Sequence, residues 1–174
     1  MKLNHLVLLS LVLATQATFA QTSDLSYESY VDSDKRIKCL YGYAAEKTGD
    51  HASAIKIFED CIERWNDVYS MIWLAQMYES GAGVEVDLAK AAALMKRGAE
   101  QPDDVAYVSL ARYHYGVVLA EGRGVKKDLQ AAREWLQRAS SAGQSEADDY
   151  LSRVDQSSAS SPRQLPHNNK RTLR

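Results

Sequence analysis

The chain has 174 residues and a formal net charge of −2 at pH 7, with 25% charged and 45% hydrophobic residues. This near-neutral charge excludes the strong basic excess of a nucleic-acid-binding protein, so we expect no nucleic-acid partner. The length is sufficient for one domain with a substantial core.

The first 20 residues have the pattern of a secretory signal peptide. Lys2 precedes an apolar run from Leu6 to Leu13, broken only by Ser10, and small or neutral residues follow as far as Ala20. A membrane-spanning helix needs about 20 apolar residues, so this run is too short for a stable anchor. We expect cleavage after Ala20, no stable membrane insertion afterwards, and a periplasmic or secreted location. A retained signal anchor is the alternative.

The two flanks of the central region differ from it in composition. Residues 21–34 carry four carboxylates and are expected to form a loosely held acidic lead-in. Residues 155–174 are rich in serine, proline, asparagine and positive charge, and they predict a disordered basic tail. Such a tail either stays solvated or touches an anionic surface. The repeat domain is expected between these flanks, over residues 35–154.

Cys39 and Cys61 are the two cysteines of the chain. In an oxidising compartment two cysteines usually pair. A bridge that closes this loop would stabilise the domain by about 3 kcal/mol in the chain-entropy model. The alternative is a metal or redox pair, but a metal site needs more ligands at closer spacing, and no CxxC is present. We therefore expect a structural disulfide, and no metal or other cofactor.

Two segments of the chain superimpose without a gap at a shift of 41 residues. Residues 73–99 read WLAQMYESGAGVEVDLAKAAALMKRGA, and residues 114–140 read HYGVVLAEGRGVKKDLQAAREWLQRAS. Repetition of this kind at a fixed spacing is typical of a repeat architecture. The matching positions are Gly81, Gly83, Val84, Asp87, Leu88 and Ala91, which fall on Gly122, Gly124, Val125, Asp128, Leu129 and Ala132.

Each repeated residue type has a physical reason, and the same reasons apply in the second unit. Gly81 can take the left-handed conformation that ends a first helix over about residues 68–79. Val84 returns from the loop to the core, and Asp87 caps the second helix by accepting from free backbone N–H groups. Small residues at the helix crossing, Ala75 facing Ala91, allow the backbones to approach closely.

The Gly-x-Gly-Val-x-x-Asp loop between small-residue helices resembles the Sel1-like repeat. Extra residues in this chain fall in the loop around residues 101–104, where Pro102 stops a helix. The resemblance implies an all-α fold, an α-solenoid of about three antiparallel helical hairpins in a Sel1-like/tetratricopeptide-like superhelix, plus a capping helix. The units are expected at about residues 35–66, 68–101 and 106–143, with the cap at 145–154.

The first unit resembles the related tetratricopeptide repeat more closely. Gly42, Gly49, Ala54 and Phe58 keep the spacing of that pattern, and a short turn replaces the longer glycine loop. The two cysteines then lie on the two antiparallel helices at similar levels. Register alone does not guarantee a bridge, since a disulfide tolerates only a narrow Cα separation.

A tetratricopeptide-like register places the first helix of each pair on the inner, concave face. Tyrosines suit recognition there, and the groove is expected to be aromatic and mildly acidic, fitting an extended peptide or a basic helix. Packing of several of these tyrosines between hairpins is the alternative, and Trp73 is assigned to the core. The expected partner-binding residues are Tyr43, Glu46, Lys47, Tyr69, Gln76, Glu79, Tyr113 and Glu121.

The sequence contains no motif of a known catalytic class. HExxH, GxSxG, a phosphate-binding glycine loop and a dinucleotide fingerprint are absent. His114 lies between two tyrosines and is expected to pack rather than to act as a base. We expect an adaptor, not an enzyme, that binds a protein or peptide partner in the cell envelope. The alternative is an envelope enzyme or ligand-binding protein acting on peptidoglycan or β-lactam-type compounds.

Overall fold

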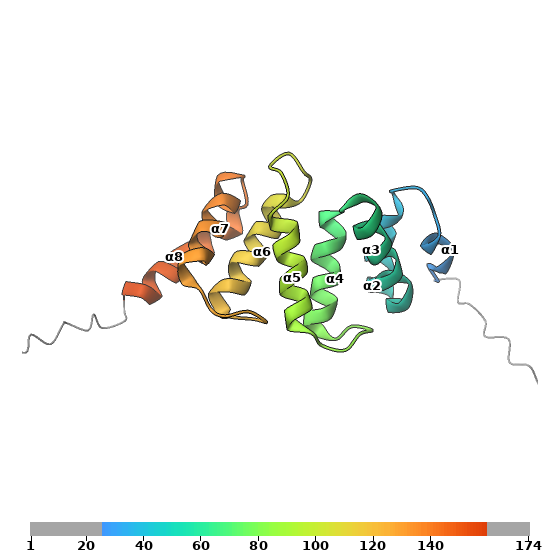
Figure 1. Ribbon diagram of the computed structural model, residues 1–174, viewed down its shortest axis with the longest axis horizontal. Helices are drawn as coiled ribbons and strands as arrows, with labels where there is room; N and C mark the ends of the chain where they lie inside the picture. The colour runs from blue at the N-terminus through green and yellow to red at the C-terminus, as the bar shows by residue number, and fades with distance from the viewer. Residues whose placement is uncertain (1–25, 160–174) are drawn as a thin grey trace, which may run out of the picture.

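The computed structural model describes residues 26–159, and this part of the chain is helical throughout, without strands (Figure 1). The all-α fold is confirmed. The expected signal peptide and the tail beyond Ala159 lie outside the described residues. The helices are α1 (Glu28–Val31), α2 (Lys38–Thr48), α3 (His51–Trp65), α4 (Val68–Ser80), α5 (Leu88–Ala99), α6 (Val108–Glu121), α7 (Leu129–Ser141) and α8 (Ser145–Ala159).

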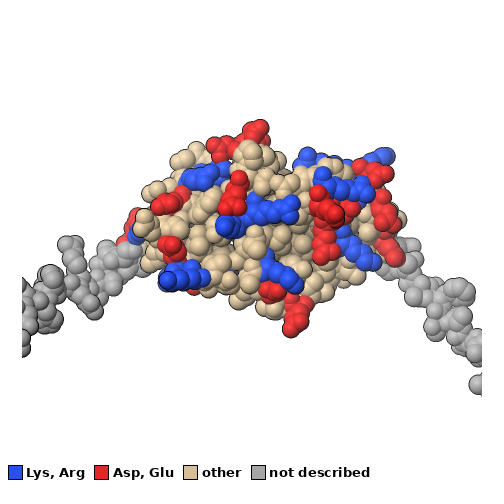
Figure 2. Space-filling model, in the orientation of Figure 1, with Lys and Arg blue, Asp and Glu red and all other residues tan. Residues whose placement is uncertain are grey.

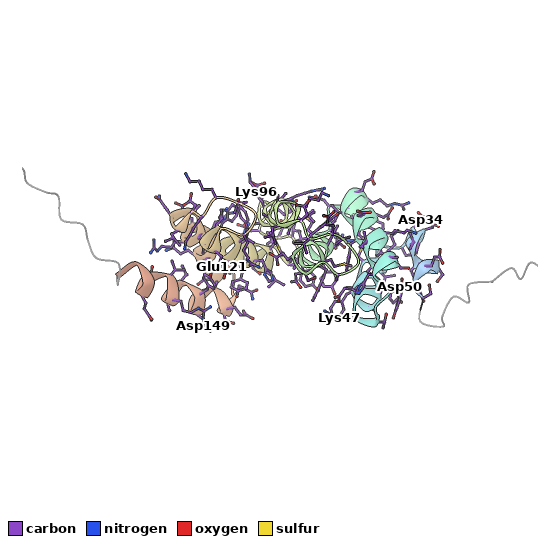
Figure 3. All side chains as sticks on the ribbon, turned by 90° about the horizontal axis from the view of Figure 1, so that it is seen from below. Asp34, Lys47, Asp50, Lys96, Glu121 and Asp149 are labelled. Atoms are coloured by element: carbon purple, nitrogen blue, oxygen red, sulfur yellow. A yellow bond between two sulfur atoms is a disulfide. The ribbon has the colours of Figure 1, made fainter. Side chains whose placement is uncertain are left out.

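The helices form two layers of a solenoid. The hairpins α2–α3, α4–α5 and α6–α7 follow one another along the long axis of the molecule (Figure 1). Seen from below, α2, α4, α6 and α8 make one layer, and α3, α5 and α7 make the other (Figure 3). In the first layer α2 and α8 project beyond α4 and α6, so we call its outer side the concave face. This arrangement confirms the α-solenoid.

The repeated residues set the ends of the helices. Asp87 Oδ1 accepts from the backbone N–H of Lys90 at 2.9 Å, and Asp128 caps α7 in the same way. Gly81 and Gly122 end α4 and α6 with φ of 78° and 76°, in the left-handed region that glycine adopts without a Cβ clash. The two hairpins therefore begin and end their helices by the same local chemistry.

Small residues let the two helices of each hairpin pack closely. A Cβ on Gly116 of α6 would lie 2.7 Å from Leu136 Cγ and 3.3 Å from the Ala132 carbonyl oxygen of α7. Ala75 and Ala91 occupy the equivalent crossing of α4 and α5, and both are buried in one core cluster. The predicted small-residue crossing is present in both hairpins.

The second glycine of each loop joins one hairpin to the one before it. Gly83 packs against the side chain of His51 at the start of α3. Gly124 packs against the backbone carbonyl of Leu88 at the start of α5. Both glycines have positive φ, 71° and 69°. The loop thus has a second role that the repeat pattern did not indicate, since it stacks neighbouring hairpins.

The core is divided along the solenoid. Phe58, Met71 and Met77 are buried in the cluster shared by the first two hairpins. The next cluster joins the second hairpin to the third, and a smaller one lies under α8, where Leu136 meets Ala147. No helix within residues 26–159 is long and apolar enough to span a bilayer.

Cys39 and Cys61 join α2 to α3 as a disulfide, with their Cα atoms 5.9 Å apart. This separation lies within the narrow range that a bridge tolerates. Both cysteines are buried, and they pack with Ile57 in a small cluster of their own. The bridge closes the first hairpin near the start of α2.

The described part of the lead-in is held in place, contrary to the expectation of a loose segment. It includes the short helix α1, and the backbone N–H of Tyr27 donates to Asp50 Oδ2 at 2.7 Å. The buried Lys38 side chain donates to the Val31 carbonyl oxygen at 2.7 Å and also pairs with Asp60 of α3. A buried ammonium group needs such partners, so it ties the lead-in to the first hairpin.

The cap helix is longer than expected, since α8 runs to Ala159 rather than ending at Val154. Val154 is buried, and Asp155 accepts from Arg133 Nε of α7 at 2.7 Å. These contacts hold the helix against α7 beyond the expected boundary. The first residues of the segment assigned to a disordered tail are therefore helical.

Candidate functional site

The eight residues expected to bind a partner all lie on helices of the concave layer. They come from α2, α4 and α6, in the hairpin order that the repeat register predicts. The structure places seven of them in two groups, with Gln76 in neither. One group gathers around Trp73 and the other lies beside α8 or the α6–α7 loop. In Figure 3 Lys47 of the first group lies at the opposite long edge of the molecule from Lys96 of α5.

Four rings on the concave layer form what we call the aromatic row: Tyr43, Trp73, Tyr69 and Tyr107. The ring centroids are 4.5 Å apart for Tyr43 and Trp73, 6.1 Å for Trp73 and Tyr69, and 5.0 Å for Tyr69 and Tyr107. Aromatic pairs prefer these separations. Because the rings come from α2, α4 and the residue before α6, the row crosses three successive hairpins.

Trp73 packs against the core cluster of the first two hairpins, so its sequence-based assignment to the core holds in part, and its ring also belongs to this row. Its side chain is half-buried. Trp73 follows Tyr69 by four residues, so both rings leave α4 on the same side. α4 is apolar on most of its circumference. The spacing of its apolar residues therefore does not distinguish the side that faces the core from the side that faces the concave surface.

Tyr107 is a member of the row that the sequence did not indicate. It precedes α6 with φ of 66°, a conformation uncommon for residues other than glycine. The loop before it is held by the buried Arg112, whose Nε donates to the Ala99 carbonyl oxygen at 3.2 Å. Arg112 also donates to the Gln101 carbonyl and pairs with Asp103. Periodicity cannot find Tyr107, because it lies outside the helix and is placed by contacts with α5.

Lys47 stands over one end of the aromatic row. Its Nζ lies 4.9 Å from the centroid of Trp73 and 5.3 Å from that of Tyr43, within the range of a cation–π interaction. The same ammonium group pairs with Glu46 Oε2 at 2.8 Å. Tyr43, Glu46 and Lys47 are therefore brought together at this end of the row.

The other end of the row borders a shallow apolar pocket of about 290 Å³. Ile37, Leu40 and Tyr107 are 53%, 47% and 47% exposed there. Exposed apolar side chains that adjoin one another are typical of interaction surfaces. The lining residues are Arg36, Ile37, Cys39, Leu40, Asp67, Tyr69 and Tyr107.

Burial, with the neighbouring phenols of Tyr107 and Tyr43, raises the pKa of Tyr69 to about 12. The phenol of Tyr69 is therefore neutral at physiological pH. A neutral phenol keeps its O–H donor, so this ring offers both an apolar face and a hydrogen bond.

Tyr113 and Glu121 form a separate group that contacts the cap helix. The ring of Tyr113 lies 6.5 Å from that of Tyr150 on α8, and the Tyr150 hydroxyl donates to Glu121 Oε1 at 3.0 Å. Burial and then this hydrogen bond raise the pKa of Tyr150 to about 12. For Tyr113 the alternative of packing between helices therefore holds.

The carboxylates expected to make the groove acidic are paired with basic side chains. Arg123 of the α6–α7 loop lies 3.0 Å from Glu79 Oε1 and 2.8 Å from Glu121 Oε2. Glu46 is paired with Lys47, as described above. Gln76 lies half-buried on α4, and its backbone carbonyl oxygen accepts from the Ser80 hydroxyl. The expected acidic character is thus offset by cations from the same face.

Comparison with protein-family models matches residues 68–103 and 109–144 to the Sel1 repeat. The chain carries two Sel1 repeats. They coincide with the hairpins α4–α5 and α6–α7, while the tetratricopeptide-like hairpin α2–α3 lies outside the match. Comparisons with curated proteins and with solved structures gave no match. The helical Sel1 fold is typically a non-enzymatic scaffold, and its repeats suggest protein partners.

The side of the solenoid that carries α3, α5 and α7 has a different character. In Figure 2 basic and acidic side chains alternate over this face, with no extended area of one sign. A groove of about 620 Å³ between α3, α4 and α5 has acidic residues on α3 and basic residues on α5. Among residues 26–159, no aromatic ring pair joins successive hairpins at this groove, in contrast to the aromatic row on the concave face.

No group of three or more histidine, cysteine or acidic residues within residues 26–159 is arranged to hold a metal ion. His114 of α6 is half-buried beside Tyr113, with their ring centroids 5.2 Å apart. Burial, with the positive charge of Arg123, lowers the pKa of His114 to about 4 against the opposing effect of Glu146. The imidazole is therefore a neutral packing group at physiological pH.

Proposed function

We propose that this Sel1-repeat protein is a periplasmic scaffold that binds a peptide or helix of an envelope partner on its concave face. The observation that carries the proposal is the aromatic row, which crosses three successive hairpins and ends beside exposed Ile37 and Leu40. Tyrosine and tryptophan supply rigid contact area at low entropic cost, and they are enriched among the residues that dominate binding energy.

The location is proposed from the N-terminal pattern and supported by the cysteine pair. Disulfides persist in oxidising compartments such as the periplasm and are rare in the cytosol. Cell fractionation with N-terminal sequencing tests the location. We expect the protein in the periplasmic fraction with Gln21 as its first residue. An uncut chain in the cytosol would contradict this part of the proposal.

Capture of partners in cells tests the binding face. We would crosslink the wild-type protein, Trp73→Leu, Tyr107→Asn and a control, Tyr30→Asn, and identify the captured proteins by mass spectrometry. Asparagine suits the positive φ at position 107. Tyr30 is a partly exposed tyrosine of α1, outside the aromatic row.

We expect an envelope protein captured by the wild type and by Tyr30→Asn. Capture should fall by about tenfold or more in the two aromatic-row variants, since removing such an anchor typically costs about 2 kcal/mol or more. Circular dichroism checks that each variant is folded. Equal capture by Trp73→Leu and the wild type would rule out the aromatic row as the binding site.

A further inference from the structure

Two ion pairs border the aromatic row and a third lies at the α6–α7 loop, and in each the cation is the more exposed member. The nitrogen–oxygen distances are 3.1, 2.8 and 3.0 Å. A partner that approaches this face therefore meets guanidinium and ammonium groups before it meets carboxylates. The pairs are Arg36 with Asp67 (side chains 61% and 11% exposed), Lys47 with Glu46 (48% and 17%) and Arg123 with Glu79 (36% and 18%).

One of these carboxylates, Asp67, also stabilises a helix end. Asp67 caps α4, accepting from both the backbone N–H and the hydroxyl of Ser70 at 2.9 Å. A guanidinium has five N–H donors and an ammonium three, and one carboxylate contact leaves most of them unused. Glu121, which is 45% exposed, departs from this pattern, but it is already paired with Arg123 and accepts a hydrogen bond from the Tyr150 hydroxyl.

The two cations nearest the row lie at its opposite ends. Arg36 lines the pocket formed with Tyr69 and Tyr107, whereas Lys47 stands over Tyr43 and Trp73. Between them the surface is aromatic. The arrangement is therefore a cation, an apolar stretch and a second cation.

Building on the proposed function, we infer that the segment bound at the aromatic row is an acidic, extended peptide. It carries a carboxylate on each side of a short aromatic or aliphatic stretch. Complementary charge across an interface selects the partner and sets its register. A basic helix on this face would instead be repelled by the exposed cations. The inference keeps the extended peptide expected from the sequence and replaces the basic helix by an acidic segment, because the sequence shows which charges are present but not which are buried.

A randomised 12-residue peptide library displayed on phage tests the inference. It is selected on the protein as the cell processes it, with the disulfide intact. We expect enrichment of aspartate and glutamate over lysine and arginine, flanking aromatic or aliphatic residues. A selected peptide is then synthesised, labelled with fluorescein and titrated by fluorescence anisotropy.

Neutralising either flanking cation should weaken binding of that peptide. Arg36→Gln and Lys47→Gln are each expected to raise the Kd by about two- to fivefold, the range for an exposed ion pair. The matched control is Lys96→Gln on α5, whose side chain is 54% exposed at the opposite edge of the molecule (Figure 3). Its Kd should equal that of the wild type.

The outcomes separate this inference from the proposed function. Selection of basic or uncharged peptides whose binding still requires Trp73 would overturn the inference and leave the proposed function intact. The inference also falls if acidic peptides bind Lys47→Gln and Arg36→Gln as tightly as the wild type. If no peptide is selected, or if every selected peptide binds Trp73→Leu as tightly as the wild type, the result counts against both the inference and the proposed function.

Discussion

At the scale of single residues, glycines with the same backbone conformation have different surroundings. Gly124 and Gly143 both have positive φ, 69° and 88°. A Cβ at position 143 would meet nothing within 4 Å, whereas one at position 124 would collide with the backbone of Leu88 and Ala89. A residue with a Cβ would therefore strain the backbone at either position, and only at position 124 would it also disturb a contact between hairpins.

Gly124→Ala is expected to destabilise the protein more than Gly143→Ala. A left-handed residue with a Cβ costs roughly 1–2 kcal/mol, and this applies to both variants. Relief of the collision at position 124 requires the α6–α7 loop to move away from α5, which adds roughly 1–3 kcal/mol as for an overpacked site. Urea denaturation measures the free energy of unfolding. Equal values for the two variants would contradict the stacking role of Gly124.

His114 predicts a dependence of stability on pH. Its pKa is about 4 in the folded protein, against an ordinary value of 6.5, so on acidification the unfolded chain binds the proton first. The free energy of unfolding should therefore fall as the pH drops from about 6.5 to about 4, with no further loss from this group below about 4.

The variant His114→Gln isolates this contribution, since carboxylates also titrate in the acidic range. Denaturation of the variant and of the wild type should give parallel curves above pH 7 and below pH 4. Between these limits the wild type should lose more stability than the variant. Identical slopes from pH 6.5 to pH 4 would show that the imidazole titrates alike in both states.

At the scale of elements, the first hairpin differs from the Sel1 repeats in how it is held. Its turn is short, and Gly49 ends α2 where the later hairpins have the longer glycine loop. A Cβ on Gly42 would lie 2.6 Å from the ring of Phe58, so close helix packing is kept. The disulfide adds a covalent tie, which the two Sel1 repeats lack.

Replacing the disulfide by Cys39→Ala/Cys61→Ala should lower the free energy of unfolding by about 3 kcal/mol, because the unfolded chain gains the entropy of an open loop. The separation of the two cysteines is 22 residues. Urea denaturation with and without dithiothreitol provides the measurement. Reductant should destabilise the wild type by a similar amount and leave the variant unchanged. A wild type insensitive to complete reduction would refute this prediction.

At the scale of the whole molecule, α8 closes an open end of the solenoid. Repeat arrays bury their apolar faces only against neighbours, so the last hairpin needs a cover. Val117, Leu136 and Ala139 are buried with Ala147 of α8. At the other end α1 packs beside the disulfide cluster through Tyr27 and Val31.

Truncation after Gly143 should expose this apolar surface and loosen the last hairpin. Hydrogen exchange in α6 and α7 is expected to quicken while α2 and α3 stay protected, since each repeat depends mainly on its neighbours. A chain that ends after Ala159 is the control and should match the full protein. Unchanged protection of α7 in the shorter chain would show that α8 is not needed as a cap.

The features that the sequence predicted correctly depend on local interactions. Gly81, Asp87 and their equivalents act on the backbone within a few residues, so a spacing of 41 residues was enough to find the hairpins and the helix crossings. The concave layer followed from the same register, and the expected site residues lie on it. The contacts of Tyr113 and Glu121 with the cap helix were not predicted, because their partner, Tyr150, lies on α8.

The sequence by itself therefore determined the three hairpins and which helix of each pair joins the concave layer. Only the tertiary structure decided the aromatic row, in which Trp73 of α4 meets Tyr43 of α2, and Tyr107 enters from a loop held by Arg112. It also decided which partner of each ion pair is exposed. The physical reason is that helix ends and turns are set by neighbours in the chain, whereas burial depends on residues brought together from different hairpins.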